Sequence, residues 1–223
     1  MAAGVTVVSR TTPVRRALMV EYLRQIGIAD ERVLAAIAAV PREAFVPRQF
    51  FHQAYEDFAL EIGEGQTISQ PSVVARIVEL AKPSEHDRAL EIGTGSGYLT
   101  AVLAQLARFV FSVERFASLA QAARGRLEAL AIRNVSVHVM DGSLGWRAHA
   151  PFEMIVVSAA APGVPASLRE QLADGGRLVI PIGDLRRQEL VLVSREGERF
   201  TESRHGDASF VPLVGCQGFG GSP

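Results

Sequence analysis

The segment Leu90-Glu91-Ile92-Gly93-Thr94-Gly95-Ser96-Gly97-Tyr98 decides the fold, because it leaves an apolar strand, turns on glycines and enters a helix. Its alternate glycines let the backbone approach a ligand closely, and the free N–H groups at a helix start favour polar or anionic groups. A dinucleotide-binding turn requires Gly or Ala where this sequence has Tyr98, which disfavours NAD. The turn therefore predicts a site for a different nucleotide-like cofactor.

Short apolar runs alternate with helical stretches from Arg88 onward, which is typical of a parallel sheet covered on both faces. The expected strands are residues 89–92, 109–113, 135–139, 154–158, 177–182 and 190–193. The expected helices between the early strands are residues 98–107 and 117–130. No helix follows Arg177, so the last strands should pair as a hairpin. We expect an α/β fold with a doubly wound, mostly parallel sheet and an antiparallel C-terminal edge.

The part of the chain before this sheet reads as helical. One helix is expected over 14–26, and a second is capped by Asp30 and stopped by Pro41. Five aromatic residues in the next stretch should hold a loop on the core: Phe45, Phe50, Phe51, Tyr55 and Phe58. A chain of 223 residues favours one domain, residues 1–223. Its expected parts are an N-terminal helical and substrate-loop region (14–82), a cofactor-binding core (88–215) and a loose tail (216–223).

Composition limits the function classes. The net charge is −1, from 23 basic and 24 acidic side chains, so nothing attracts nucleic acid generally. A single cysteine, Cys216, excludes an internal disulfide. No stretch approaches the ~20 apolar residues of a membrane span, and the start lacks an apolar signal segment. The five histidines lack metal-ligand spacing, so no metal site is predicted. We expect a cytoplasmic monomer that binds neither membrane nor nucleic acid.

Three carboxylates lie in or after successive strands. Glu91 is inside the first strand, at a position typical of S-adenosylmethionine enzymes. Glu114 ends the second strand, where the fold brings a carboxylate to the ligand's ribose, and Asp141 ends the third, near an adenine edge. Any one of these carboxylates is more often a solvated loop side chain than a cofactor contact. The three together, at successive strand ends, predict S-adenosylmethionine as the cofactor. The predicted cofactor-binding residues are Glu91, Gly93, Thr94, Gly95, Ser96, Gly97, Glu114, Arg115, Asp141 and Gly142.

A possible carboxylate site precedes Pro71, which suits the first position of a helix running to about Lys82. Ser69 and Gln70 would then lie at its positive end. Backbone N–H groups and the Ser69 hydroxyl could hold a substrate carboxylate there. The alternative is that Ser69 only caps the helix.

Gly65-Gln66-Thr67-Ile68-Ser69-Gln70-Pro71 resembles the signature loop of the protein-L-isoaspartate O-methyltransferase family, bacterial type. Further stretches resemble family segments in family order: 40–47, 90–98, 159–162, 175–183 and 210–213. The similarity spans roughly residues 14–215. It implies a Rossmann-like class I methyltransferase fold with S-adenosylmethionine as cofactor. It also implies methylation of isoaspartyl carboxylates in damaged proteins and peptides, with spontaneous succinimide formation returning some normal aspartate.

The resemblance also implies residue roles. Thr67 and Ser69 would act at the methyl-transfer site. The implied substrate-binding residues are Ile68, Ala160, Pro162, Val211 and Pro212. The sequence departs from common family residues at Ser72, Met140 and Ser143, which bears on cofactor affinity and substrate preference.

Other functions are weighed against this one. A methyltransferase of the same fold for RNA or a small molecule would predict an aromatic or basic motif near the fourth strand, where residues 159–162 are small and apolar. A non-catalytic cofactor-binding relative would bind cofactor without methylating any isoaspartyl peptide. The Gly-x-Ser-x-Gly pattern within residues 93–97 also occurs in α/β-hydrolases, but the strand glutamate fits cofactor binding better.

Overall fold

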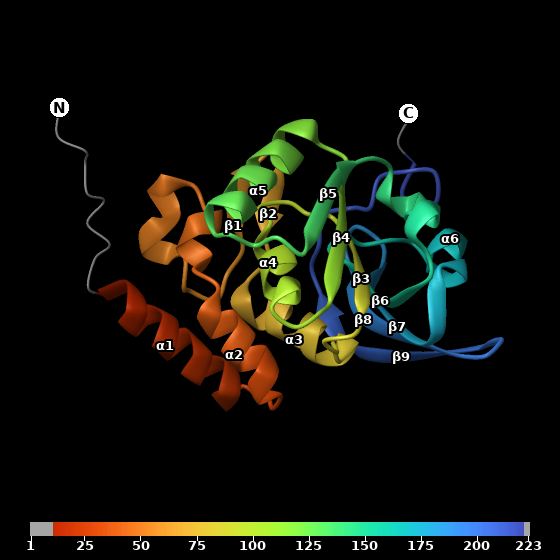
Figure 1. The fold of residues 1–223 in the computed structure, drawn as a ribbon, viewed down its shortest axis with the longest axis horizontal. Coiled ribbons are helices and arrows are strands. Elements are labelled where there is room, and N and C mark those ends of the chain that lie inside the picture. The colour runs from red at the N-terminus through yellow and green to blue at the C-terminus, as the bar shows by residue number, and fades with distance from the viewer. Residues whose placement is uncertain (1–10, 221–223) are drawn as a thin grey trace.

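A seven-stranded sheet forms the centre of the molecule in the computed structural model, which describes residues 11–220 (Figure 1). Its strands are β3 (Arg88–Ile92), β4 (Phe109–Glu114), β5 (Val135–Val139), β6 (Phe152–Val157), β7 (Leu172–Gly183), β8 (Gln188–Glu196) and β9 (Arg199–Ala208). Their order is β5-β4-β3-β6-β7-β8-β9. The pairs from β5 to β7 are parallel, whereas β7–β8 and β8–β9 are antiparallel. The predicted mostly parallel sheet with an antiparallel edge is therefore confirmed.

The strand order reverses at β3, and this reversal positions the site. The chain continues from β3 to β4 and β5 on one side of the sheet, then crosses to β6 and β7 on the other. The loops that follow neighbouring strands diverge at such a point and leave a crevice at the carboxyl ends of the strands. The glycine turn after Ile92 enters this crevice directly.

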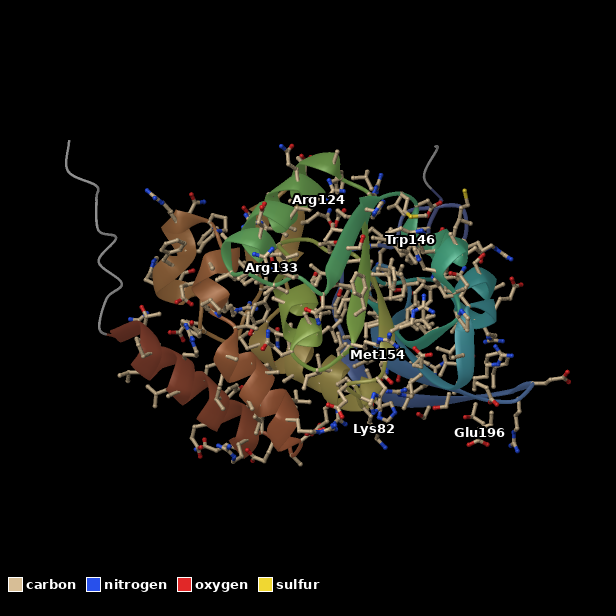
Figure 2. All side chains as sticks on the ribbon, in the orientation of Figure 1. Lys82, Arg124, Arg133, Trp146, Met154 and Glu196 are labelled. Carbon is tan, nitrogen blue, oxygen red and sulfur yellow. The ribbon has the colours of Figure 1, made fainter. Side chains whose placement is uncertain are left out.

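Helices cover the two faces of the sheet unequally. They are α1 (Thr11–Gln25), α2 (Glu31–Ala39), α3 (Pro71–Ala81), α4 (Tyr98–Ala104), α5 (Ala117–Ala129) and α6 (Ala166–Glu170), with short 3-10 helices η1 (Arg42–Phe45), η2 (Arg48–Gln53), η3 (Gly142–Leu144) and η4 (Arg147–His149). Residues of α1 to α5 share one core with Met154, whereas the adjacent Ile155 packs with α6 and Leu213 on the opposite face. Side chains alternate along a strand, so β6 contributes to both cores. Figure 2 draws the side chains on the ribbon and labels Met154.

Some elements differ from the sequence-based expectation. The hairpin β7–β8 is confirmed, but β9, α6 and a small hairpin of β1 (Leu60–Gly63) and β2 (Gln66–Ile68) were not predicted. Strand β9 is mostly exposed and polar, so it lacks the apolar run that identifies a strand. The small hairpin turns through Glu64 and Gly65, both at positive φ. It lies in the stretch that we expected to be a loop.

The aromatic residues of this stretch behave in two ways. Phe45 and Tyr55 are buried and Phe50 packs against the core, as predicted. Phe51 and Phe58 are 44% and 43% exposed, so the prediction is wrong for these two. Phe51 belongs to η2, which has no buried residue.

The C-terminal segment is more ordered than a loose tail. The backbone N–H groups of Cys216 and Gln217 donate to the side chains of Asp141 and Ser143. The remaining tail residues 221–223, and residues 1–10 of the predicted single domain, lie outside the described part of the chain. No helix within residues 11–220 is both long and apolar enough to cross a membrane.

Candidate active site

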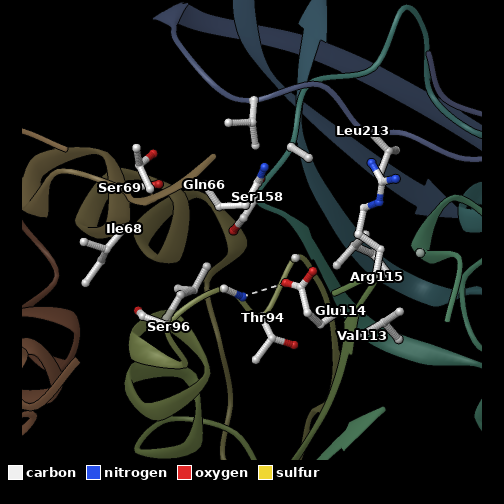
Figure 3. Close-up of a pocket in the computed structure, with 18 of the residues that line it drawn as sticks. Gln66, Ile68, Ser69, Thr94, Ser96, Val113, Glu114, Arg115, Ser158 and Leu213 are labelled. Atoms are coloured by element: carbon white, nitrogen blue, oxygen red, sulfur yellow. Dashed lines mark hydrogen bonds between the residues drawn. The ribbon is translucent and has the colours of Figure 1, made fainter. Parts of the chain in front are cut away.

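A crevice opens at the carboxyl ends of β3, β4 and β6 (Figure 3). About 870 Å³ of space lies between its walls, including open solvent at its mouth. The predicted site residues that line it are Thr67, Ile68, Ser69, Gly93, Thr94, Gly95, Ser96, Glu114, Arg115, Gly142, Val211 and Pro212. The structure therefore brings the glycine turn, the loop before α3 and the C-terminal segment together around one cavity.

The glycine turn has a backbone that other residues adopt only with strain. Gly93 and Gly97 have φ angles of 93° and 91°. A Cβ atom on Gly93 would lie 3.4 Å from the Cβ of Ser158, and one on Gly97 would lie 3.2 Å from the Cβ of Ala123. Gly97 thus lets α4 start close to α5 and does not itself line the crevice.

Glu114 connects the second strand to the glycine turn. Its Oε2 accepts a hydrogen bond of 2.9 Å from the Gly95 N–H, which Figure 3 marks. Its Oε1 accepts one of 3.0 Å from the Phe116 N–H. The carboxylate is 5% exposed, so it is fixed at the wall of the crevice, and the exposed Arg115 follows it at the rim.

Glu91 lies behind the wall of the crevice. The hydroxyls of Thr100 and Ser112 donate to its Oε2 over 2.5 and 2.6 Å, and Ser112 also shares a hydrogen bond with Thr94. Complete burial raises the pKa of Glu91 to about 7, although these two hydroxyl donors oppose the shift. Glu91 does not line the crevice and is connected to its lining through Ser112 and Thr94.

Asp141 also lies outside the wall. Its carboxylate accepts hydrogen bonds from the Ser143 N–H (2.9 Å), the Ser143 hydroxyl (2.7 Å) and the Cys216 N–H (2.8 Å). Burial raises the pKa of Asp141, but the bonds from Cys216 and Ser143 outweigh it and leave the pKa lowered. Asp141 anchors the C-terminal segment, and the adjacent Gly142 lines the crevice.

Two of the three family departures have structural partners. Ser143 is buried, and its hydroxyl accepts the Gln217 N–H while donating to Asp141, so it helps to anchor the C-terminal segment. The Ser72 hydroxyl accepts a hydrogen bond from the Gln70 side chain at the start of α3. Met140 packs against the core on the α6 face.

The loop before α3 presents Thr67, Ile68 and Ser69 to the crevice. Gln70, not Ser69, is the N-cap residue of α3, and it makes no side-chain capping bond. Within residues 11–220 the Ser69 hydroxyl has no hydrogen-bond partner. The alternative that Ser69 only caps the helix is therefore not what the structure shows.

Two predicted substrate residues lie away from the cavity. Ala160 is fully buried, and its backbone pairs with the C-terminal segment through Ala160 N–H to Val211 O (2.8 Å) and Leu213 N–H to Ala160 O (2.7 Å). These two bonds hold the segment that contains Val211 and Pro212 against the end of β6. Pro162 is exposed beyond this bridge and lines no part of the crevice.

Further lining residues were not predicted. They include Gln66, Tyr98, Leu99, Val113, Ser158 and Val214, whereas Ala159 and Leu213, which also line the crevice, belong to segments that the family resemblance had assigned to the site. Ser158 directly follows β6, so the rule that ligands lie at strand ends could have identified it. Gln66 and Tyr98 are inside the two quoted motifs, but their types gave no reason to select them.

A second hollow adjoins the first. The two share Thr67, Ser69, Ser158 and Val211. The second hollow extends toward the end of β9, where Asp207 is the one charged residue in its lining. No residue of the glycine turn lines the second hollow, whereas Ser69 lines both. No group of His, Cys, Asp and Glu side chains within the described residues is arranged to hold a metal ion.

Solved structures share the fold. The chain superposes with a TM-score of 0.83 and 30% identity on a structure described as a protein-L-isoaspartate O-methyltransferase, covering 91% of this chain and 67% of that one. It superposes with a TM-score of 0.77 and 25% identity on a putative protein-L-isoaspartate O-methyltransferase from Plasmodium falciparum in complex with S-adenosyl-L-homocysteine, covering 89% and 98%. The fold and the crevice are those of a class I S-adenosylmethionine-dependent methyltransferase.

Sequence comparison defines the family. A family model described as protein-L-isoaspartate(D-aspartate) O-methyltransferase matches residues 14–218. Proteins named protein-L-isoaspartate O-methyltransferase are 50% identical in Vibrio atlanticus, over 88% of this chain and 94% of the relative, and 49% identical in Halorhodospira halophila, over 96% of each. The chain belongs to the protein-L-isoaspartate(D-aspartate) O-methyltransferase family.

Proposed function

We propose that this enzyme repairs damaged proteins by transferring a methyl group from S-adenosylmethionine to the free carboxylate of L-isoaspartyl residues. The observation that carries the proposal is the meeting of the glycine turn and the Thr67–Ser69 loop across one crevice. A donor on one wall and an acceptor on the other would then be neighbours. We also propose a single-domain, cytoplasmic monomer without nucleic-acid or membrane partners, as the composition led us to expect.

The cofactor's seat is proposed on the glycine-turn side. The close-approach backbone from Gly93 to Gly95 fits a ligand that lies directly on the main chain. Glu114 would accept hydrogen bonds from ribose hydroxyls, and its position at the end of β4 supports this role. Glu91 has an Oε1 atom that is buried without a partner, and its carboxylate would balance the cofactor's cationic end through Ser112 and Thr94.

The acceptor's seat is proposed at the loop before α3. The Ser69 hydroxyl would donate to the substrate carboxylate beside the start of α3, which carries partial positive charge. Pro71 has no N–H, and the Ser72 N–H already donates to the Asp57 carboxylate, so neither is a donor to the substrate. Thr67, which lines both hollows, would contact the isoaspartyl residue where they join. Ile68, Val211 and Pro212 would exclude water around it.

The chemistry requires alignment more than acid or base assistance. When bound, S-adenosylmethionine supplies a methyl group that is already activated by the adjoining sulfonium. A carboxylate oxygen forms the new bond to the methyl carbon as the carbon–sulfur bond breaks, and its electron pair stays on sulfur. No proton moves, because the carboxylate is ionised at neutral pH. Holding the acceptor oxygen in line and shielding it from water are therefore the tasks of the protein.

The residues next to the isoaspartate are proposed to occupy the second hollow. It continues from Thr67 and Ser69 toward Ser209 and Phe210, where Gln188 holds the backbone of Phe210 through two hydrogen bonds. A peptide seated there would present its isoaspartyl residue to the first crevice. Asp207 would face one flanking side chain.

A matched pair of peptides tests the proposal. One peptide has isoaspartate and the other has normal aspartate at the same position, and transfer of labelled methyl from S-adenosylmethionine is measured for both. We expect base-labile label on the isoaspartyl peptide alone. Binding of S-adenosyl-L-homocysteine without label on either peptide would overturn the repair function and favour a non-catalytic relative or a different substrate.

A further inference from the structure

Arg42, at the start of η1, is completely buried. Its Nε donates to the Ala54 carbonyl over 2.8 Å, and its Nη2 donates to the Ser69 carbonyl over 2.6 Å. The central guanidinium carbon lies 4.7 Å from the centre of the Tyr98 ring. Ser69 belongs to the loop before α3, and Tyr98 begins α4 after the glycine turn. Arg42 therefore joins the two walls of the crevice from behind.

The charge of Arg42 has no carboxylate partner. Its Nη1 is buried without a hydrogen bond, and Arg42 forms no ion pair within residues 11–220. The adjacent Glu43 is engaged by Arg16 and by the Tyr55 hydroxyl instead. Burial lowers the pKa of Arg42, with Tyr98 and then Asp57 opposing this shift, but a guanidinium stays protonated in proteins. The structure thus keeps an unpaired cation in its interior.

An unpaired buried cation is costly to folding, so its location matters. Two of the three residues that Arg42 contacts, Ser69 and Tyr98, line the crevice. A carboxylate bound at the Ser69 hydroxyl would be attracted by the guanidinium, which donates to the carbonyl of the same residue, and the complete burial of Arg42 limits screening of this attraction by water. The cation would then gain a counter-charge in addition to Asp57, whose carboxylate attracts it in the folded chain without forming an ion pair.

We propose that Arg42 is a positioning residue for the methyl acceptor. It binds the Ser69 carbonyl while its guanidinium lies over the Tyr98 ring, and its positive charge makes the acceptor site at Ser69 selective for an anionic group. This inference rests on the proposed function of the same site. It adds that the substrate carboxylate is attracted by the charge of Arg42, which lies behind the wall of the crevice and does not line it.

Binding to two peptides separates the charge from a structural role. One peptide contains isoaspartate, and the other contains isoasparagine, whose free carboxylate is replaced by a neutral carboxamide of similar shape. Dissociation constants are measured by calorimetry for the full-length enzyme saturated with S-adenosyl-L-homocysteine. The variants are Arg42→Met, Arg42→Gln and Arg42→Lys, with Arg133→Met on the exposed surface as the control.

We expect Arg42→Met and Arg42→Gln to weaken binding of the isoaspartyl peptide about tenfold and to leave the isoasparaginyl peptide nearly unchanged. Arg42→Lys keeps the charge and should keep most of the preference for the carboxylate. Equal weakening of both peptides, or no change in either, would overturn the inference. If Arg42→Met does not fold, the comparison of Arg42→Gln with Arg42→Lys decides. A preference for the isoaspartyl over the isoasparaginyl peptide that is kept in Arg42→Gln and lost in Arg42→Lys would contradict the proposal, because it would depend on hydrogen-bond donors and not on charge.

The two proposals can fail separately. If the wild-type enzyme neither binds nor methylates the isoaspartyl peptide, the proposed function is wrong. If it methylates that peptide and the Arg42 variants discriminate between carboxylate and carboxamide as the wild type does, only the role of Arg42 is wrong.

Discussion

The Gly95 N–H and the Glu114 carboxylate are joined by a hydrogen bond of 2.9 Å, which ties the end of β4 to the glycine turn after β3. We expect Glu114→Gln to weaken binding of S-adenosyl-L-homocysteine about tenfold or more, because ribose hydroxyls would lose a charged acceptor. Calorimetric titration measures this affinity. Glu128→Gln, on the exposed face of α5, is the matched control. Unchanged affinity in Glu114→Gln would remove Glu114 from the cofactor site.

Ser69→Ala tests the acceptor side alone. Loss of one hydroxyl bond to a carboxylate should raise the KM for an isoaspartyl peptide about tenfold, with S-adenosyl-L-homocysteine affinity unchanged. Steady-state kinetics with labelled methyl donor gives KM and kcat separately. Ser203→Ala on the exposed strand β9 should resemble the wild type. Equal loss of peptide and cofactor binding in Ser69→Ala would point to a disturbed loop instead of a lost contact.

Glu91 gives the stability a pH dependence. Its pKa of about 7 in the folded protein lies above its value of about 4.5 in the unfolded chain, so between these values the folded state binds more protons. This contribution to stability is present below pH 4.5 and is lost as the pH rises through 7. In the wild type, the free energy of unfolding should therefore decrease by on the order of 3 kcal/mol over this pH range, and we expect the Glu91→Gln variant to lack this decrease. Urea unfolding of the cofactor-free protein at several pH values measures it, and parallel curves for the two proteins would contradict it.

Asp141 should matter for stability and, indirectly, for cofactor binding. Asp141→Ala removes the acceptor for three hydrogen bonds that anchor the C-terminal segment, at a cost of about 2–3 kcal/mol. Leu213 and Val214 of this segment line the crevice, so the affinity for the cofactor should fall together with the stability. Chemical unfolding and calorimetry provide the two readouts. Asp184→Ala, which removes a similar acceptor in an exposed turn, should leave cofactor affinity intact.

Asp207 should set a preference among isoaspartyl peptides. A lysine next to the isoaspartate should give a higher kcat/KM than a glutamate there, by about threefold at low salt, since the carboxylate is exposed. Asp207→Lys should reverse the order, whereas Asp174→Lys, outside both hollows, should not. The same preference in all three proteins would show that the flanking residue binds elsewhere.

Local sequence features were sufficient for the parts of the site built on the main chain. The run from Leu90 to Tyr98 specifies a strand, a turn at positive φ and a helix, and each of these depends on neighbouring residues only. The strand-end rule likewise placed Glu114 beside this turn, because parallel strands align their carboxyl ends. The resemblance of residues 65–71 to a family loop selected Thr67 and Ser69, which do line the crevice.

Side-chain direction was decided by the tertiary structure. Glu91 and Asp141 occupy the predicted strand positions, yet one turns into the core toward Thr100 and the other toward Cys216. Arg42 lies in the family-like segment 40–47, but its role was not predicted, because its partners Ala54 and Ser69 are 12 and 27 residues away in the chain. The sequence by itself determined the strands, the glycine turn and the acceptor loop through local backbone preferences. Only the tertiary structure decided which carboxylates face the cavity and where an unpaired cation lies, because burial and long-range hydrogen bonds exist only once distant segments pack together.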